Sequence, residues 1–176
     1  MPKNILYYIP IIILFFICIF FFFSLNNDTS KLSSPIVGKE VPEFFLPSLF
    51  LDQNDFSSSA LYSDDPQIVN VWASWCIPCR AEHDILMLLS KLEKVEIYGV
   101  NYKDNRNEAI NFINELGNPY ANIGLDEEGR TAIDWGVYGI PESFIIHQGI
   151  VIYKHIGPIH MTDLDEIILP IIKDLQ

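Results

Sequence analysis

The strongest constraint on the fold is a nearly continuous apolar run, Ile-Val-Asn-Val-Trp-Ala, at residues 68–73. A run of this length without alternation is typical of a β-strand that is buried on both faces. Beyond it, apolar residues recur at the spacing of one helix face, namely Ala81, Ile85, Leu88, Leu89 and Leu92. A strand covered on both faces by other elements predicts an α/β domain built around a sheet.

Similar patterns continue along the chain. They predict strands at residues 95–100 and 120–125, helices at residues 109–116 and 128–135, a hairpin of residues 143–146 and 150–155, and an edge strand at residues 43–46. A last helix should open with a capping box of Thr162 and Asp165 and bend at Pro170. We therefore expect a central mixed β-sheet flanked by helices.

The N-terminus carries a second kind of apolar segment. Residues 5–25 include only Pro10 and Ser24 as non-apolar positions, and no charge occurs between Lys3 and Asp28. As a helix this segment would be roughly 31 Å long, enough to span a bilayer. Its length and the lack of a small-x-small site favour an uncleaved signal anchor over a cleavable signal peptide. The flanking charges place the N-terminus in the cytoplasm and the rest in a bacterial periplasm, with one pass through the inner membrane.

The chain is thus expected to have three parts. These are a transmembrane anchor at residues 1–25, a polar tether at residues 26–37 and one domain at residues 38–176. A domain of this size excludes a multidomain enzyme. With 11 basic and 23 acidic side chains, the net charge of −12 also excludes nucleic acid and anionic lipid surfaces as partners.

A Cys-Ile-Pro-Cys motif, Cys76 to Cys79, directly follows the buried strand and opens the amphipathic helix. The N-terminal sulfur then faces the free N–H groups and the positive end of the helix, which lowers a thiol pKa. We predict that Cys76 is the exposed nucleophile and Cys79 the buried resolving thiol. No metal and no cofactor besides this redox-active pair are expected.

Two other readings of the motif stay open. A structural disulfide would suit an extracytoplasmic domain, although so short a loop removes little chain entropy. A zinc site could use His83, although no second ligand pair with finger-like spacing occurs. Covalent haem attachment is excluded, because Arg80 stands where a histidine would be needed.

Residues 69–83, Val-Asn-Val-Trp-Ala-Ser-Trp-Cys-Ile-Pro-Cys-Arg-Ala-Glu-His, resemble the active-site region of thioredoxin-fold proteins. The Trp-Cys-x-x-Cys-Arg-Ala-Glu-His form is similar to the membrane-anchored thiol-disulfide interchange proteins of cytochrome c biogenesis, the CcmG/DsbE subfamily. Residues 99–104, 115–120 and 136–142 resemble further segments of that subfamily in the same order. The resemblance runs from about residue 38 to the C-terminus, includes the anchor, and implies a thioredoxin-like fold.

The resemblance also implies a catalytic role for Pro141, whose bond to Ile140 should be cis and lie against the two sulfurs. An ordinary trans proline that opens the hairpin is the alternative. A missing N–H beside the thiols would leave neighbouring backbone groups free to pair with an extended substrate. Trp75, Ile140, Tyr138 and Glu142 are the substrate-binding residues that it suggests, whereas Trp72 should pack under the sheet.

Where many thioredoxins have a buried aspartate, this chain has Asn70, which cannot take a proton. The subfamily comparison offers Glu82, as a catalytic acid, and Glu142 instead, since an acid near a buried thiol could relay its proton. A solvated surface carboxylate is the alternative for each. Arg80 would either stabilise the Cys76 thiolate or lie in solvent.

The resemblance implies a periplasmic oxidoreductase that reduces disulfides in apocytochrome c, or in its maturation partners, and is itself re-reduced by a membrane electron-donor protein. Two alternatives remain: a general membrane-tethered thioredoxin-like reductant, and a non-catalytic module that binds apocytochrome or haem-handling proteins. Trapping of clients and a nucleophile variant would separate the three.

Overall fold

The computed structural model describes residues 5–25, 36–92 and 95–176, with the side chains of residues 5–7 and 23–25 left out. The chain divides into two compact units, residues 1–33 and 34–176. The first contains helix α1 (Ile5–Leu25), whose described side chains run from residue 8 to residue 22. Over the residues whose side chains are described, which in α1 are residues 8–22, no helical stretch is both long and apolar enough to cross a membrane. Most of the predicted tether, residues 26–35, lies outside the described residues.

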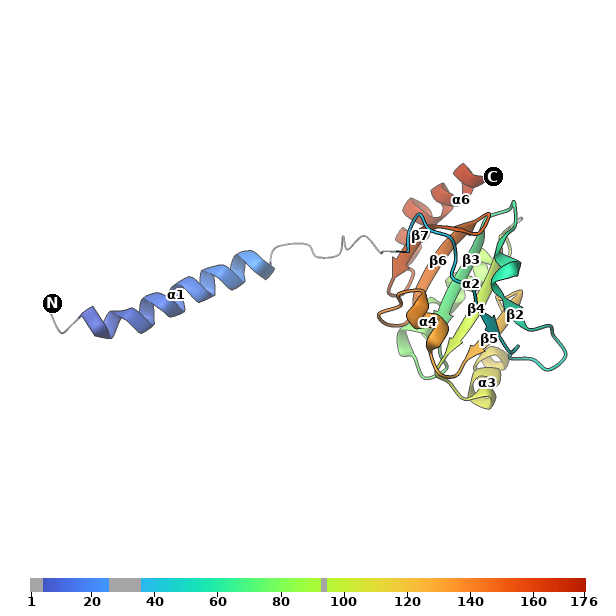
Figure 1. Cartoon of the computed structure of the whole chain (residues 1–176), viewed down its shortest axis with the longest axis horizontal. Coiled ribbons are helices and arrows are strands. Elements are labelled where there is room, and N and C mark those ends of the chain that lie inside the picture. The colour runs from blue at the N-terminus through green and yellow to red at the C-terminus, as the bar shows by residue number, and fades with distance from the viewer. Residues whose placement is uncertain (1–4, 26–35, 93–94) are drawn as a thin grey trace. The chain divides into compact units, whose positions relative to one another are not determined.

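The second unit is built on a five-stranded mixed sheet with the strand order β5-β4-β3-β6-β7 (Figure 1). Its strands are β3 (Gln67–Trp72), β4 (Glu96–Tyr102), β5 (Asn122–Asp126), β6 (Glu142–His147) and β7 (Ile150–Ile156). The first three are parallel, and β6 and β7 run antiparallel to their neighbours. All six residues of the central strand β3 are buried, which confirms the interpretation of the apolar run.

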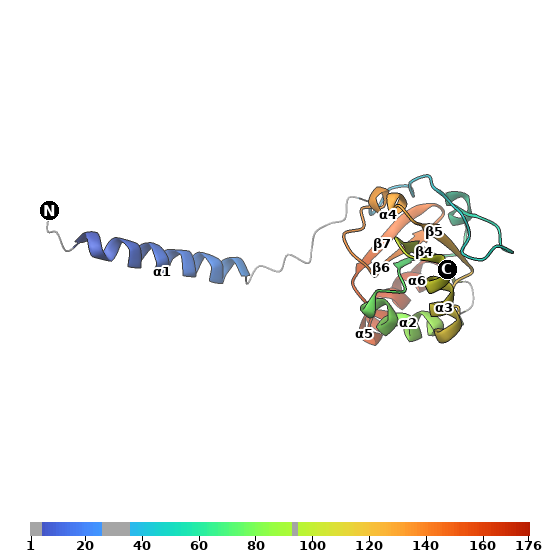
Figure 2. The ribbon, with the colours of Figure 1, turned by 90° about the horizontal axis from the view of Figure 1, so that it is seen from below.

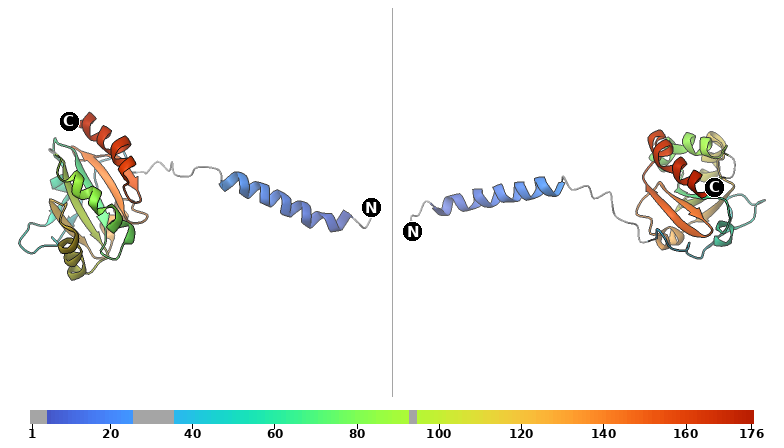
Figure 3. Two further views of the ribbon diagram at one scale, coloured as in Figure 1. Left: turned by 180° about the vertical axis from the view of Figure 1, so that it is seen from behind. Right: turned by 90° about the horizontal axis from the view of Figure 1, so that it is seen from above.

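One face of the sheet is covered by helices. They are α2 (Ile77–Leu89), α3 (Arg106–Leu116) and a C-terminal helix made of α5 (Met161–Asp163), the π-helical segment η3 (Leu164–Ile168) and α6 (Leu169–Leu175). The parallel strands are adjacent and in chain order, so both right-handed crossovers place α2 and α3 on this face. Figure 3 shows them in front of the sheet in the view from behind.

The opposite face is covered differently from the prediction. Of the α-helices in the described part of this unit, only the short helix α4 (Arg130–Asp134) lies on this face (Figure 2), and the chain before β3 covers the rest. That chain forms β1 (Phe45–Leu46), β2 (Phe56–Ser57) and the 3-10 turn η2 (Ser58–Leu61). The predicted edge strand is only this β1, which pairs with β2 and not with the large sheet.

The buried face of α2 matches the apolar spacing only in part. Leu89 is buried and Ile85 half-buried, as predicted, but Ala81, Leu88 and Leu92 are exposed. The helix also buries Cys79, Glu82, His83 and Leu86. The helix is thus rotated so that the cysteine pair faces the sheet. Two polar side chains share this face, and each finds a hydrogen-bond partner there.

The C-terminal helix begins two residues earlier than its sequence predicts. The capping box is formed by His160 and Asp163, and not by Thr162 and Asp165. The bend at Pro170 stays a prediction, but the helix contains a π-helical segment that ends at Ile168, two residues before that proline. Proline lacks the N–H that would continue the hydrogen-bond ladder, so a change of helix type beside it has a local cause.

The chain before β3 also pairs with both edge strands. Residues 38–41 bond to the start of β7, with the Gly38 N–H 2.8 Å from the Val151 carbonyl oxygen. Residues 47–49 bond to β5, with the Leu49 N–H 2.8 Å from the Ile123 carbonyl oxygen. Parts of both outer strands therefore have hydrogen-bond partners on each side.

Candidate active site

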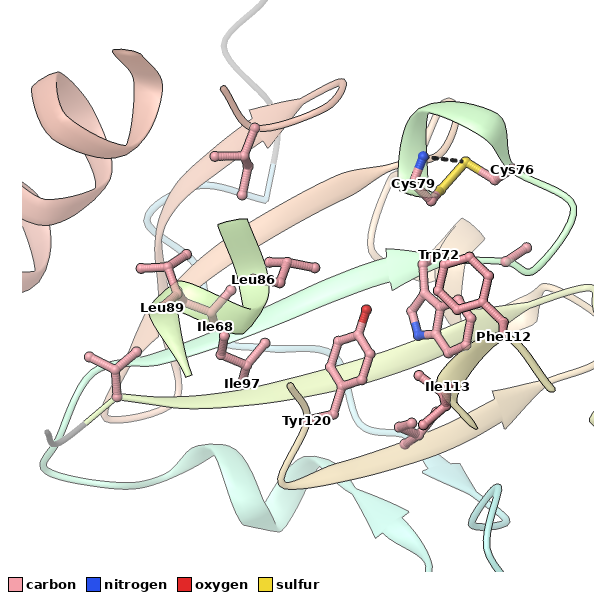
Figure 4. Close-up of a cluster of buried hydrophobic side chains, with 14 of the residues drawn as sticks. Ile68, Trp72, Cys76, Cys79, Leu86, Leu89, Ile97, Phe112, Ile113 and Tyr120 are labelled. Atoms are coloured by element: carbon pink, nitrogen blue, oxygen red, sulfur yellow. Dashed lines mark hydrogen bonds between the residues drawn. A yellow bond between two sulfur atoms is a disulfide. The ribbon is translucent and has the colours of Figure 1, made fainter. Parts of the chain in front are cut away.

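The two cysteines form a disulfide at the first turn of α2 (Figure 4), with their Cα atoms 5.3 Å apart. Cys76 is the N-cap residue, and its Sγ accepts the N–H of Cys79 at 3.1 Å. Pro78 occupies the first turn, where a missing N–H costs nothing. Charge on the Cys76 sulfur would thus be stabilised by the end of the helix, as a nucleophilic thiolate requires.

Exposure does not separate the two sulfurs as expected. Cys76 is 4% exposed and Cys79 is 2% exposed, so both are buried in the disulfide form. The neighbouring Trp75 and Ile77 are instead 57% and 82% exposed. Large apolar side chains in solvent therefore flank the disulfide, and the cap position distinguishes the first cysteine from the second.

The loop that precedes Cys76 is held by the carboxylate of Asp104, which the sequence did not single out. This carboxylate accepts the Ser74 N–H at 2.6 Å and the Ser74 hydroxyl at 2.7 Å. It also accepts the side-chain amide of Asn101 at 2.9 Å and the N–H of Asn105 at 2.8 Å. The only sequence signal for this arrangement is the subfamily-like segment at residues 99–104.

The same segment holds the exposed tryptophan. The indole N–H of Trp75 donates to the carbonyl oxygen of Lys103 at 3.2 Å. Trp75 borders a cleft of about 410 Å³ between the start of α2 and α3, whose lining also includes Phe112, Glu108 and Asn111. The β4–α3 connection therefore shapes the surface beside the disulfide.

A buried polar network lies behind the helix. Asn70 on the central strand donates to Glu82 at 2.9 Å and to the Ser143 hydroxyl at 3.0 Å, and it accepts the Tyr120 hydroxyl at 2.9 Å. The second oxygen of Glu82 accepts the Ile159 N–H at 2.8 Å. The alternative of a solvated Glu82 is therefore wrong, because the side chain is 1% exposed and fully hydrogen-bonded.

Burial raises the pKa of Glu82 from its usual 4.5 to about 7, against the opposing effect of the hydrogen bonds from Ile159 and Asn70. Glu82 lies one turn beyond Cys79 on the same buried face of α2. A carboxyl group that titrates near neutral pH can both accept and return a proton, which is the property a proton relay needs.

Aromatic rings adjoin this network through Tyr120, and Figure 4 shows the rings of Trp72, Phe112 and Tyr120 close together. Trp72, predicted to pack under the sheet, is 1% exposed and stacks on Tyr120 with ring centroids 5.7 Å apart. Phe112 contacts its other side at 4.9 Å. His83 is also buried here, with Nε2 3.0 Å from the Gly117 carbonyl oxygen, and burial lowers its pKa. Within the described residues, no group of three His, Cys, Asp or Glu residues could hold a metal ion.

The loop before β6 holds the other proposed substrate-binding residues. The Ile140–Pro141 bond is cis, as the resemblance implied. Ile140 packs against the buried cluster that includes both cysteines, and Tyr138 is 70% exposed. The catalytic role of Pro141 stays a prediction.

Glu142 is the exception in this loop. Its side chain is 0% exposed, so neither a substrate contact nor the solvated alternative fits its position. It lies 2.9 Å from the ammonium group of Lys154, which is itself buried. Arg80 does not face the cysteines either: it pairs with Glu115 on α3 at 2.7 Å and lies over the Phe112 ring.

A disulfide at the N-terminus of a helix, beside the central strand of a mixed sheet, defines a thiol-disulfide oxidoreductase of the thioredoxin-like class. The family model Redoxin matches residues 36–168. The thiol:disulfide interchange protein DsbE of Tatumella citrea is 42% identical over 166 residues, covering 91% of this chain and 89% of that protein. The chain therefore belongs to the Redoxin family, among the DsbE thiol:disulfide interchange proteins.

Other relatives agree with this assignment. The DsbE protein of Escherichia coli K12 is 42% identical over 146 residues, covering 82% of this chain and 78% of that protein. A crystal structure from Chlorobium tepidum, provisionally described as a DsbE protein, has a TM-score of 0.66 and 25% identity, covering 80% of this chain and 98% of that one. Both are described as thiol:disulfide interchange proteins.

Proposed function

We propose that this protein is a membrane-anchored periplasmic oxidoreductase that reduces disulfides in apocytochrome c, or in its maturation partners. The observation that carries the redox role is the Cys76–Cys79 disulfide at a helix N-terminus, with the buried carboxyl of Glu82 one turn away. The cytochrome c client is supported by the subfamily-like segments of the sequence.

The reaction moves two electrons and two protons to the client. The Cys76 thiolate attacks one sulfur of the client disulfide, and the other client sulfur leaves as a thiolate and takes a proton from solvent, which balances the proton that Cys76 released on ionising. Cys79 gives its proton to Glu82 and attacks Cys76 Sγ in the mixed disulfide, which releases the second client thiolate. Glu82 then gives up the proton that this second thiolate takes, and the protein is left with its own disulfide.

The direction of electron transfer, from this protein to the client, follows from the compartment that we propose. In an oxidising periplasm the two cysteines of a haem-binding motif pair with each other, whereas haem attachment needs free thiols. The oxidised domain must then be re-reduced by a membrane electron-donor protein. Residues 5–25, which carry no charge, support the anchor in the inner membrane, and Lys3 before them supports a periplasmic domain.

Client trapping tests this proposal. The full chain with Cys79→Ala, on a Cys18→Ser background that removes the other thiol, stalls at the mixed disulfide with Cys76. We expect the trapped proteins to include apocytochromes with a Cys-x-x-Cys-His motif. Recovery only of proteins without that motif would support the general reductant instead. The matched control is the same chain with Cys76→Ser added, which should trap nothing.

Two further measurements separate the remaining alternatives. A Cys76→Ser variant that still supports full cytochrome c maturation would favour the non-catalytic binding module. The reduction potential of the cysteine pair tests the direction, because a value near about −120 mV is that of a strong oxidant and a reductant needs a much lower one.

A further inference from the structure

Lys154 on β7 is a buried lysine that the redox chemistry does not use. Its side chain is 1% exposed, and its Nζ lies 2.9 Å from Oε2 of Glu142, whose side chain is 0% exposed. The same ammonium group donates to the Gly136 carbonyl oxygen at 2.7 Å. One buried cation therefore contacts both ends of the loop from residue 136 to residue 142.

The middle of this loop is held by the same pair of charges. Nζ of Lys154 lies 4.5 Å from the centroid of the Tyr138 ring, in a cation–π contact. The N–H of Tyr138 donates to Oε1 of Glu142 at 3.1 Å. The ring is nevertheless 70% exposed, so one side of it rests on the ammonium group while much of it stays open to solvent.

A buried ion pair contributes little net free energy to the stability of a fold. Desolvation of both charges cancels much of their attraction, and an apolar pair of similar volume is often as good. The ion pair, the hydrogen bond and the nearer cation–π contact of the Lys154 ammonium group all fall on residues 136–142, and a longer cation–π contact, at 5.4 Å, falls on the Phe144 ring. The location of the ion pair therefore indicates that it fixes the loop and does not mainly stabilise the core.

We propose that Lys154 is a positioning residue that holds the loop of residues 136–142 from inside, through Gly136, Tyr138 and Glu142, so that Tyr138 is a fixed aromatic platform for the client chain. This inference rests on the proposed function insofar as the client is a protein disulfide. A protein client would contact the platform, whereas a small disulfide would reach the cysteines without it.

The test compares two disulfide substrates. We expect Lys154→Met to raise the KM for a peptide with a disulfide-bonded Cys-x-x-Cys-His motif about tenfold, with kcat little changed. The variant loses the hydrogen bond to Gly136, the ion pair with Glu142 and the cation–π contact with Tyr138, all of which hold the loop. The rate with 5,5′-dithiobis(2-nitrobenzoate), a small disulfide, and the reduction potential should not change. Lys173→Met, an exposed lysine near the C-terminus, is the matched control and should resemble the wild type.

Equal peptide KM values for Lys154→Met and the wild type would overturn the inference, and so would an equal loss with both substrates. If the single variant does not fold, Lys154→Met combined with Glu142→Gln removes both charges, and the same KM comparison is made on it. If the wild-type protein reduces an unrelated disulfide peptide better than the Cys-x-x-Cys-His peptide, the cytochrome client is wrong. The role of Lys154 is then tested with the unrelated peptide, by the ratio of the KM of Lys154→Met to that of the wild type.

Discussion

Asn70 donates a hydrogen bond to the carboxylate of Glu82 at 2.9 Å and accepts one from the Tyr120 hydroxyl, also at 2.9 Å. The asparagine amide can do both because it has an N–H donor and a carbonyl acceptor, whereas an ionised aspartate has acceptors only. An aspartate at this position would place a second carboxylate against Glu82. With asparagine at position 70, the network has one titrating carboxyl group, that of Glu82. This group lies on helix α2, and not on the central strand where many thioredoxins have a buried aspartate.

The raised pKa of Glu82 makes stability depend on pH. The folded protein binds this proton more tightly than the unfolded chain, so the free energy of unfolding should fall as pH rises from about 4.5 to about 7. The loss attributable to Glu82 is at most about 3 kcal/mol. Glu82→Gln should flatten this dependence in urea titrations of the oxidised protein from pH 4 to pH 8. Glu127→Gln, an exposed site, should keep it; an unchanged pH slope in Glu82→Gln would contradict the assignment.

The same substitution should slow one chemical step. If Glu82 accepts the proton of Cys79, Glu82→Gln should slow the resolution of the mixed disulfide about 100-fold and leave the first attack by Cys76 unaffected. Rapid quenching with acid, followed by mass spectrometry, measures both steps. Equal slowing of both steps would indicate a general disturbance of the site.

The fold was largely predictable because its main signals are local. The apolar run of β3, the helix face of α3 and the turn between β6 and β7 are each carried by consecutive residues. The orientation of α2 could not be predicted in full. Glu82 and His83 are polar, and their burial depends on Asn70 and Gly117, which are distant in sequence. Apolar periodicity cannot count a charged residue as part of the core.

The site shows the same division. The cysteine motif and the proline loop could be recognised from sequence, but Asp104 and Lys154 could not be. Each has a partner that is well separated from it in the sequence: Ser74 is 30 residues from Asp104, and Gly136 is 18 residues from Lys154. From sequence alone, a single aspartate or lysine is predicted to lie on the surface, because such residues are rarely buried without a partner and the partner is not visible in the sequence.

Asp104→Ala should loosen the loop before the cysteines. It removes four hydrogen bonds, two of them to Ser74, and charged acceptors contribute about 1.5–3 kcal/mol each before compensation by water. We expect a loss of about 2–3 kcal/mol in the free energy of unfolding. Asp52→Ala, in an exposed loop, is the control and should cost little. A loss as small as that of the control would show that water replaces these contacts.

Gly99→Ala should disturb the aromatic cluster. A Cβ at this position on β4 would lie 2.9 Å from Nε1 of Trp72 and 3.2 Å from the Tyr120 ring. Such overpacking costs about 1–3 kcal/mol, which thermal unfolding can measure. Gly139→Ala is the matched control for stability, since no atom would lie within 4 Å of its Cβ. Equal melting temperatures for the two variants would mean that the rings move aside without strain.

The pairing of residues 38–41 and 47–49 with the outer strands limits how another polypeptide can attach. An extended chain commonly binds by adding a strand to a free sheet edge, and such additions can grow into aggregates. Here β5 has neighbours on both sides along its middle, and so does the start of β7. An extended polypeptide therefore cannot add itself to the sheet as a further strand at these two places, because the edge hydrogen-bonding groups there already have partners within the protein.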